Sequence, residues 1–198
     1  MARPSTTIHI AVSLLLIATV MVSTTNAMDD NVREACKATR HPTLCVRTLS
    51  PFSRAAGRSP HRWARAAVSV ALAETERVRR DLSREVRARI RAGSPRAQGA
   101  LADCAECFGD AVGELWSSLM TLRTLRAVTF GPQMGDVETW VSAALTDVFT
   151  CVDGLKEVRW AAARAVEGKA VNVTCLASNA LALVNRLAVT GAGSLNHP

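Results

Sequence analysis

The 198-residue sequence contains no tyrosine and has only four tryptophans and four phenylalanines. Strands of sandwiches and barrels are rich in aromatic and β-branched residues, so this composition argues against an all-β fold. Alanine, leucine, valine and arginine dominate instead, and 48% of the residues are apolar. This fraction is sufficient for the core of one domain, and the mixture of residue types favours long helices.

Sequence motifs of catalysis are also missing. After residue 27 the only histidines are His41, His61 and His197, and the chain has no His-Glu-x-x-His motif, Gly-x-Ser-x-Gly elbow or phosphate-binding glycine loop. Cys104 and Cys107 have the spacing of redox and zinc motifs, but they lie inside a helical pattern with no strand before it. We therefore predict no catalytic residue, no metal site and no cofactor.

Only one long apolar run is present, from Ile10 to Val22, and it follows Arg3 and precedes small residues that end at Ala27. The pattern predicts a secretory signal peptide over residues 1–27, since the run is too short to span a bilayer. We expect the mature chain to be secreted and to have no membrane segment. Export would make Asn172 of Asn172-Val173-Thr174 a candidate N-glycosylation site, although sequons inside helices often remain unmodified.

Apolar residues recur at helical spacing through almost all of the mature chain, which predicts an all-α fold. We expect an N-terminal helical hairpin and linker over residues 28–60, with its turn at His41-Pro42. An up-down-up-down four-helix bundle should follow over residues 61–191, and a tail over residues 192–198. The expected bundle helices cover about 63–92, 97–125, 137–165 and 170–189, with a loop around Gly131-Pro132 and Gly135.

All six cysteines lie in the mature chain, and an even number in an exported protein favours disulfides over reduced thiols or metal ligands. Fifteen pairings of six cysteines are open. Cys36 and Cys45 flank the hairpin turn and can meet locally, while Cys104 and Cys151 fall on the apolar stripes of adjacent antiparallel helices.

Charge is distributed unevenly along the chain. Residues 33–96 contain sixteen basic and five acidic side chains, a net +11, whereas residues 103–157 contain three basic and nine acidic ones, a net −6. The arginines over residues 77–91 could attract nucleic acid, but secretion argues against that partner. The open alternatives are association with an acidic polysaccharide and a surface that only keeps the protein soluble.

Four carboxylates of the acidic half recur at spacings of three, four and four, which places them on one stripe of the predicted helix: Asp103, Glu106, Asp110 and Glu114. The stripe is either an ordinary solvated face or a docking strip for a basic protein. If it docks by charge, binding should weaken as these carboxylates protonate near their reference pKa of about 4.

The runs Val137–Asp147 and Thr150–Gly154, together with Ala100–Cys104 and Ser178–Leu183, resemble the plant invertase and pectin methylesterase inhibitor family. The resemblance covers the whole mature chain. It implies a secreted, disulfide-stapled four-helix bundle with an N-terminal hairpin, in which Cys36 pairs with Cys45 and Cys104 with Cys151. It also implies that the protein is not an enzyme, but binds a cell-wall enzyme in the apoplast and blocks it.

Two branches of this family differ in their target. Invertase inhibitors typically carry Pro-Lys-Phe between the first two bundle helices, where this chain has Pro95-Arg96-Ala97. The run Thr139–Leu145 is similar to pectin methylesterase inhibitors, a branch thought to cover the pectin cleft of the enzyme with its second and third bundle helices. The resemblance thus implies pectin methylesterase as partner, with acid invertase as the alternative and acidic pectin as a further electrostatic partner. A non-inhibitory wall-binding protein, or the detached pro-region of a larger esterase, is the third hypothesis.

The predicted interface combines the acidic stripe with a polar face of the third bundle helix, made of Thr139, Ser142, Thr146, Asp147 and Thr150. This chain departs from the family pattern at Phe149, which we expect to point outward, and at two additional cysteines. Cys107 lies about 60° round the helix from Cys104. It could reach the fourth bundle helix and bond Cys175, or both thiols could stay free; we expect the bond.

Overall fold

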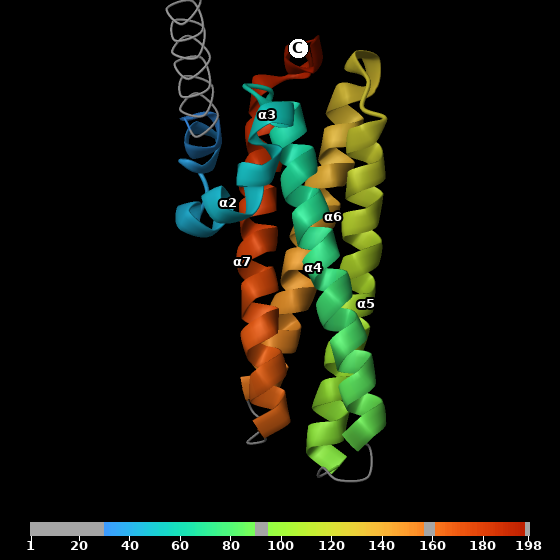
Figure 1. Cartoon of the computed structure of the whole chain (residues 1–198). Coiled ribbons are helices and arrows are strands. Elements are labelled where there is room, and N and C mark those ends of the chain that lie inside the picture. The colour runs from blue at the N-terminus through green and yellow to red at the C-terminus, as the bar shows by residue number, and fades with distance from the viewer. Residues whose placement is uncertain (1–29, 90–94, 157–160, 197–198) are drawn as a thin grey trace, which may run out of the picture.

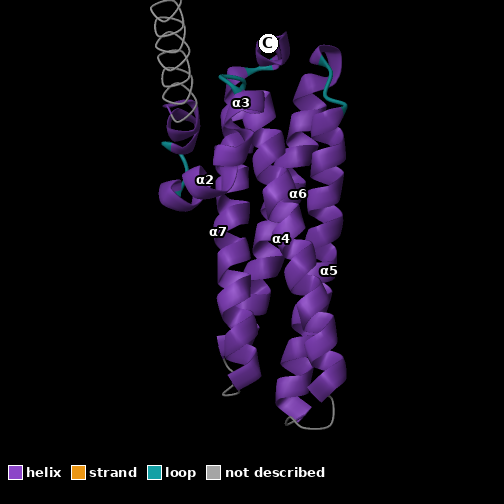
Figure 2. Ribbon diagram, viewed as in Figure 1, coloured by secondary structure: helices purple, strands orange, loops and turns teal. Residues whose placement is uncertain are grey.

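The computed structural model describes residues 30–89, 95–156 and 161–196, so the predicted signal peptide, residues 1–27, lies outside the described residues. Figure 2 shows that the described chain consists of helices joined by short loops, with no strand. The N-terminal part comprises helical residues 30–36, α2 (Pro42–Leu49), the 3-10 helix η1 (Ser50–Phe52) and α3 (Ser53–Ala56). The long helices are α4 (Pro60–Arg89), α5 (Pro95–Arg123), α6 (Phe130–Lys156) and α7 (Ala161–Thr190), and η2 (Ala127–Thr129) and η3 (Ala192–Asn196) are 3-10 helices.

Helices α4 to α7 form the predicted up-down-up-down bundle (Figure 1). Each long helix packs against the next one in the chain, and α7 closes the bundle against α4, so α5 and α7 lie diagonally opposite each other. The apolar stripes read from the sequence meet in one core, in which Leu82, Phe108, Leu115, Val148 and Leu183 are at most 2% exposed. Burying a side chain of this size stabilises the fold by about 1.5–3 kcal/mol.

The predicted loop around Gly131-Pro132 and Gly135 is wrong, because α6 already begins at Phe130. Proline is tolerated in the first turn of a helix, since its missing N–H has no partner there in any case. The turn that precedes α6 is η2, where the Gln133 side-chain oxygen accepts hydrogen bonds from the Arg126 amide at 3.0 Å and the Thr129 hydroxyl at 2.7 Å.

Two further boundaries differ from the prediction. The third bundle helix ends at Lys156 rather than near residue 165, and residues 161–165 belong to α7. Leu155 is the last buried apolar residue described in α6, and Val166 is the first one described in α7. The end of the apolar stripe therefore predicts the end of α6 better than the helical spacing of the residues after it. The linker predicted at the end of residues 28–60 contains η1 and α3. It turns into α4 at Gly57, whose φ of +53° is a conformation that suits glycine.

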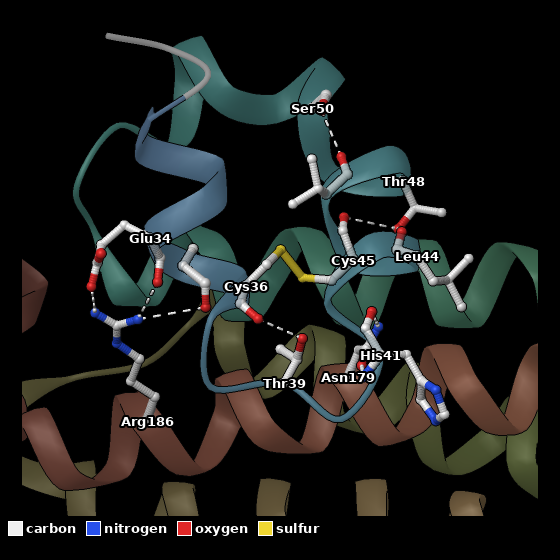
Figure 3. Close-up of a disulfide and its surroundings, with 12 residues drawn as sticks. Glu34, Cys36, Thr39, His41, Leu44, Cys45, Thr48, Ser50, Asn179 and Arg186 are labelled. Carbon is white, nitrogen blue, oxygen red and sulfur yellow. Dashed lines mark hydrogen bonds and ion pairs between the residues drawn. A yellow bond between two sulfur atoms is a disulfide. The ribbon is translucent and has the colours of Figure 1, made fainter.

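The N-terminal hairpin is held against the outer side of α7 (Figure 3). The disulfide between Cys36 and Cys45 closes it as predicted, with 5.7 Å between the two Cα atoms. The buried Asn179 side chain of α7 donates to the His41 carbonyl and accepts from the His41 amide, both at 3.0 Å. Arg186, two turns further along α7, donates to the Glu34 carbonyl at 3.0 Å. Asn179, which belongs to the Ser178–Leu183 run, and Arg186 thus join the hairpin to α7.

Residues Arg164–Thr190 of α7 are long and apolar enough, by length and composition, to cross a membrane. In the described structure this stretch is the fourth bundle helix, with α4 and α6 on its inner sides and the hairpin outside. Its apolar composition is therefore accounted for by packing on several sides.

Replacement Asn179→Ala should lower the free energy of unfolding by about 1–3 kcal/mol, because the amide and carbonyl of His41 both lose their partner. Ser178→Ala is the control, since it changes a neighbouring side chain that is not buried. Chemical denaturation of both variants measures the difference. Equal stabilities for Asn179→Ala and the unmodified protein would contradict this role of Asn179.

Candidate partner-binding face

The disulfide between Cys104 of α5 and Cys151 of α6 forms as predicted, with 4.5 Å between the Cα atoms. Both cysteines are buried, so the bond fixes the two antiparallel helices from inside the bundle. Because α5 and α6 are antiparallel, residue numbers rise along α5 as they fall along α6. From this bond, Thr146 of α6 is level with Gly109 of α5, and Ser142 is level with Gly113. The acidic stripe of α5 and the polar face of α6 therefore belong to neighbouring helices in fixed register.

We call the nine predicted interface residues on these two helices the acceptor face: Asp103, Glu106, Asp110, Glu114, Thr139, Ser142, Thr146, Asp147 and Thr150. Seven of them are exposed, and Glu114 and Asp147 are half-buried. The structure brings Asp110 and Glu114 of α5 close enough to Asp147 of α6 for their charges to interact. Asp103 and Glu106 continue the same stripe toward the start of α5.

The threonine hydroxyls of α6 donate their protons inside their own helix. Thr139 bonds the carbonyl of Gly135 at 2.8 Å, Thr146 that of Ser142 at 3.0 Å, and Thr150 that of Thr146 at 2.9 Å. Because the protons are used internally, the hydroxyl oxygens remain outward as acceptors. Together with the carboxylates they form a surface of hydrogen-bond acceptors, which complements a partner rich in basic donors.

Glu114 of α5 and Asp147 of α6 are half-buried carboxyls that interact with each other across the two helices. Burial, the Asp147 charge, a hydrogen bond to Asp147 and the Asp110 charge together raise the pKa of Glu114 to about 7, and burial is the largest of these causes. The pKa of Asp147 is also raised, by burial and by Asp110. Glu114 Oε2 is buried and has no hydrogen-bond partner among the described residues. The expectation of titration near 4 is therefore wrong for Glu114.

The closeness of Glu114 to Asp147 was not predicted from the sequence. The signal that could have revealed it is the Cys104–Cys151 pair, because its register places residue 147 level with residue 108 and within two turns of Glu114. In the described part of the chain, no group of three or more His, Cys, Asp or Glu residues is arranged to hold a metal ion.

The predicted bond between Cys107 and Cys175 is wrong, since both thiols are free. Cys107 lies on α5 and Cys175 on α7, and these helices are diagonal in the bundle. Burial raises the pKa of both thiols, and Asp147 raises that of Cys107 further, which places this thiol on the α6 side of α5. Cys175 instead lines an open groove between α6 and α7.

Two other predicted positions lie on α6 and α7. Phe149 is 51% exposed, as predicted, and Lys156 Nζ lies 5.7 Å from the centre of its ring. Asn172 is half-buried within α7, and its amide donates to Glu74 Oε1 at 3.4 Å. Glycosylation of Asn172 stays a prediction, and this helical, bonded position does not favour it.

Comparison with known protein families matches residues 30–183 to the family described as Plant invertase/pectin methylesterase inhibitor. Pectinesterase inhibitor 6 of Arabidopsis thaliana is 46% identical over 162 residues, which cover 81% of this chain and 76% of that protein. Pectinesterase inhibitor 3 of Arabidopsis thaliana is 33% identical over 186 residues, or 91% of this chain and 90% of that protein.

The fold matches a solved structure of the same kind. The crystal structure of mutant form A of a pectin methylesterase inhibitor from Arabidopsis superimposes with a TM-score of 0.63 and 22% identity. The match covers 77% of this chain and 93% of that one. The family match extends from the hairpin into α7, and the fold, the two predicted disulfides and the similarity to curated inhibitors agree with it. This chain therefore belongs to the plant invertase/pectin methylesterase inhibitor family.

Proposed function

We propose that this protein is a secreted inhibitor that binds pectin methylesterase in the cell wall and covers its pectin-binding cleft with the acceptor face. The observation that carries the proposal is the concentration of exposed carboxylate and hydroxyl acceptors on one pair of helices that a buried disulfide holds together. Support also comes from relatives that are named pectinesterase inhibitors.

Inhibition on this account is steric, and it requires no bond-making by the inhibitor. Rigid helices bring a preformed set of acceptors to the enzyme, so little conformational entropy is lost on docking. The exposed carboxylates Asp103, Glu106 and Asp110 attract a basic surface over several ångströms, which speeds encounter and makes affinity sensitive to salt.

The charge of this face depends on pH through its half-buried carboxyls. In the folded chain the pKa of Glu114 is about 7, against 4.5 in the absence of these contacts. Between these values the folded state binds more protons than the unfolded state. The free energy of unfolding therefore falls as pH rises through this window, and Glu114 is fully destabilising above about pH 7.

Reversing two exposed charges, in Glu106→Lys with Asp110→Lys, should weaken inhibition of pectin methylesterase by at least about tenfold, because the face then repels a basic partner. The control is Asp30→Lys with Glu76→Lys, which makes the same change of net charge outside α5 and α6. Titration of each purified protein against one pectin methylesterase and one acid invertase measures the effect. Undiminished inhibition by the folded interface variant, or inhibition of invertase alone, would contradict the proposal.

Glu114→Gln should raise the melting temperature at about pH 8 and leave it nearly unchanged at about pH 5, since the amide cannot ionise. Glu106→Gln is the matched control, because it removes an exposed carboxylate from the same stripe. Thermal unfolding at both pH values tests this. A gain that is the same at both pH values would show that ionisation of Glu114 is not the cause.

A further inference from the structure

A second charged surface lies where the start of α4 meets the end of α5, beside α3. Arg62 and Arg65 of α4 and Arg123 of α5 line a pocket of about 340 Å³. Phe52, which is 36% exposed, and the buried side chain of Leu119 form apolar parts of the same wall. We call this the arginine pocket.

The three arginines have no carboxylate within ion-pair distance in the described part of the chain. Arg62 donates one bond to the Ala55 carbonyl at 3.2 Å, and Arg123 makes only a 3.8 Å contact with the sulfur of Met120. Most of their guanidinium donors therefore have no partner among the described residues and are available to a ligand.

His61 fixes the arginines of α4 relative to the end of α5. Its Nε2 lies 2.6 Å from the carbonyl oxygen of Leu122, the residue that precedes Arg123. Burial lowers the pKa of His61, and the charges of Arg65 and Arg62 lower it further. The contact between His61 and Leu122 thus holds the two helices together at the pocket.

In the part of the densest basic run whose side chains the structure describes, residues 77–84, three arginines are ion-paired. Arg77, Arg80 and Arg84 each lie within 4.0 Å of a carboxylate of α4. The partners are Glu74, Glu76 and Asp81. Lys169 of α7 also pairs with Asp81, at 2.5 Å. These cations are partly neutralised within the protein, so the number of arginines in this run overstates its attraction for anions.

We propose that the arginine pocket binds carboxylates of an acidic polysaccharide, a polyuronate such as demethylesterified pectin. Planar guanidinium groups form paired hydrogen bonds with carboxylates, and the pocket offers three such groups. Its apolar wall with Phe52 suits the carbon-bound hydrogens of a sugar ring. Repeated carboxylates along one polymer raise the affinity through multiple contacts. The choice of an extracellular polyanion rests on the export that the proposed function includes.

The pocket and the acceptor face can be occupied together. Arg123 follows Asp110 by thirteen residues on α5, which places it about 140° round the helix from the acidic stripe. The two surfaces therefore lie on different sides of the bundle. They also have opposite charge, since arginines line the pocket and carboxylates form the stripe. A polysaccharide in the pocket would hold the inhibitor in the wall and leave the acceptor face free.

The test measures binding of the mature, oxidised protein to polygalacturonate by titration calorimetry at low and moderate salt. Arg62→Gln, Arg65→Gln and Arg123→Gln together should weaken binding at least about tenfold, as loss of several charge-assisted contacts predicts. The control is Arg79→Gln, Arg80→Gln and Arg84→Gln, which removes the same charge from exposed positions of α4 and should change affinity less than about twofold. Because Arg62 also bonds Ala55, the double variant Arg65→Gln/Arg123→Gln is measured beside them.

Equal losses in the pocket and control variants would overturn the proposal, since net charge alone would then explain binding. Equal affinity for fully methylesterified pectin would overturn carboxylate recognition, and equal affinity for duplex DNA would reduce the site to general attraction of polyanions. The assay contains no enzyme, so its result is independent of pectin methylesterase inhibition. The pocket variants should inhibit the enzyme as the unmodified protein does.

Discussion

The covalent link between α5 and α6 is the constraint on which the acceptor face depends. The Cys104–Cys151 disulfide joins residues 47 apart in sequence, and a loop of this size corresponds to about 4 kcal/mol of stabilisation in the chain-entropy account. It also fixes the register of two helices that turn their polar sides outward together. That register brings Asp147 toward Asp110 and Glu114, and the partial burial of Glu114 and Asp147 near like charges is a cost that the disulfide and the apolar core offset.

The bundle carries different properties on its different sides. Helix α7 receives the hairpin through Asn179 and Arg186, so its outer side is partly covered. Helices α5 and α6 present acceptors, and the end of the bundle near α3 presents unpaired arginines of α4 and α5. An up-down bundle permits this division, because each helix contributes only one stripe to the core and leaves the rest for contacts.

Much of this architecture follows from the sequence, and each wrong prediction has its own physical cause. Apolar spacing predicted the helices. Both disulfides that the family resemblance implied are present, one between the cysteines that flank the hairpin turn and one between cysteines on the apolar stripes of adjacent helices. The loop predicted around Gly131, Pro132 and Gly135 was wrong, because the first turn of a helix accepts residues that are also common in loops. The prediction of a Cys107–Cys175 bond was wrong because it rested on the angular position of Cys107 on its own helix. That angle does not show that α5 and α7 lie diagonally opposite each other in the bundle. The raised pKa of Glu114 and the arginine pocket each depend on residues that are distant in sequence. They could be recognised only once the folded structure was known.

Chemical labelling of carboxyl groups, with and without pectin methylesterase, identifies the surface of the inhibitor that the enzyme covers. Carbodiimide-driven labelling followed by mass spectrometry reports the exposure of each Asp and Glu. Docking through the acceptor face should shield Asp103, Glu106 and Asp110 from labelling, whereas Asp30 and Glu76, outside α5 and α6, should stay reactive. Unchanged labelling of the α5 carboxylates in a saturated complex, with shielding elsewhere, would contradict docking through the acceptor face.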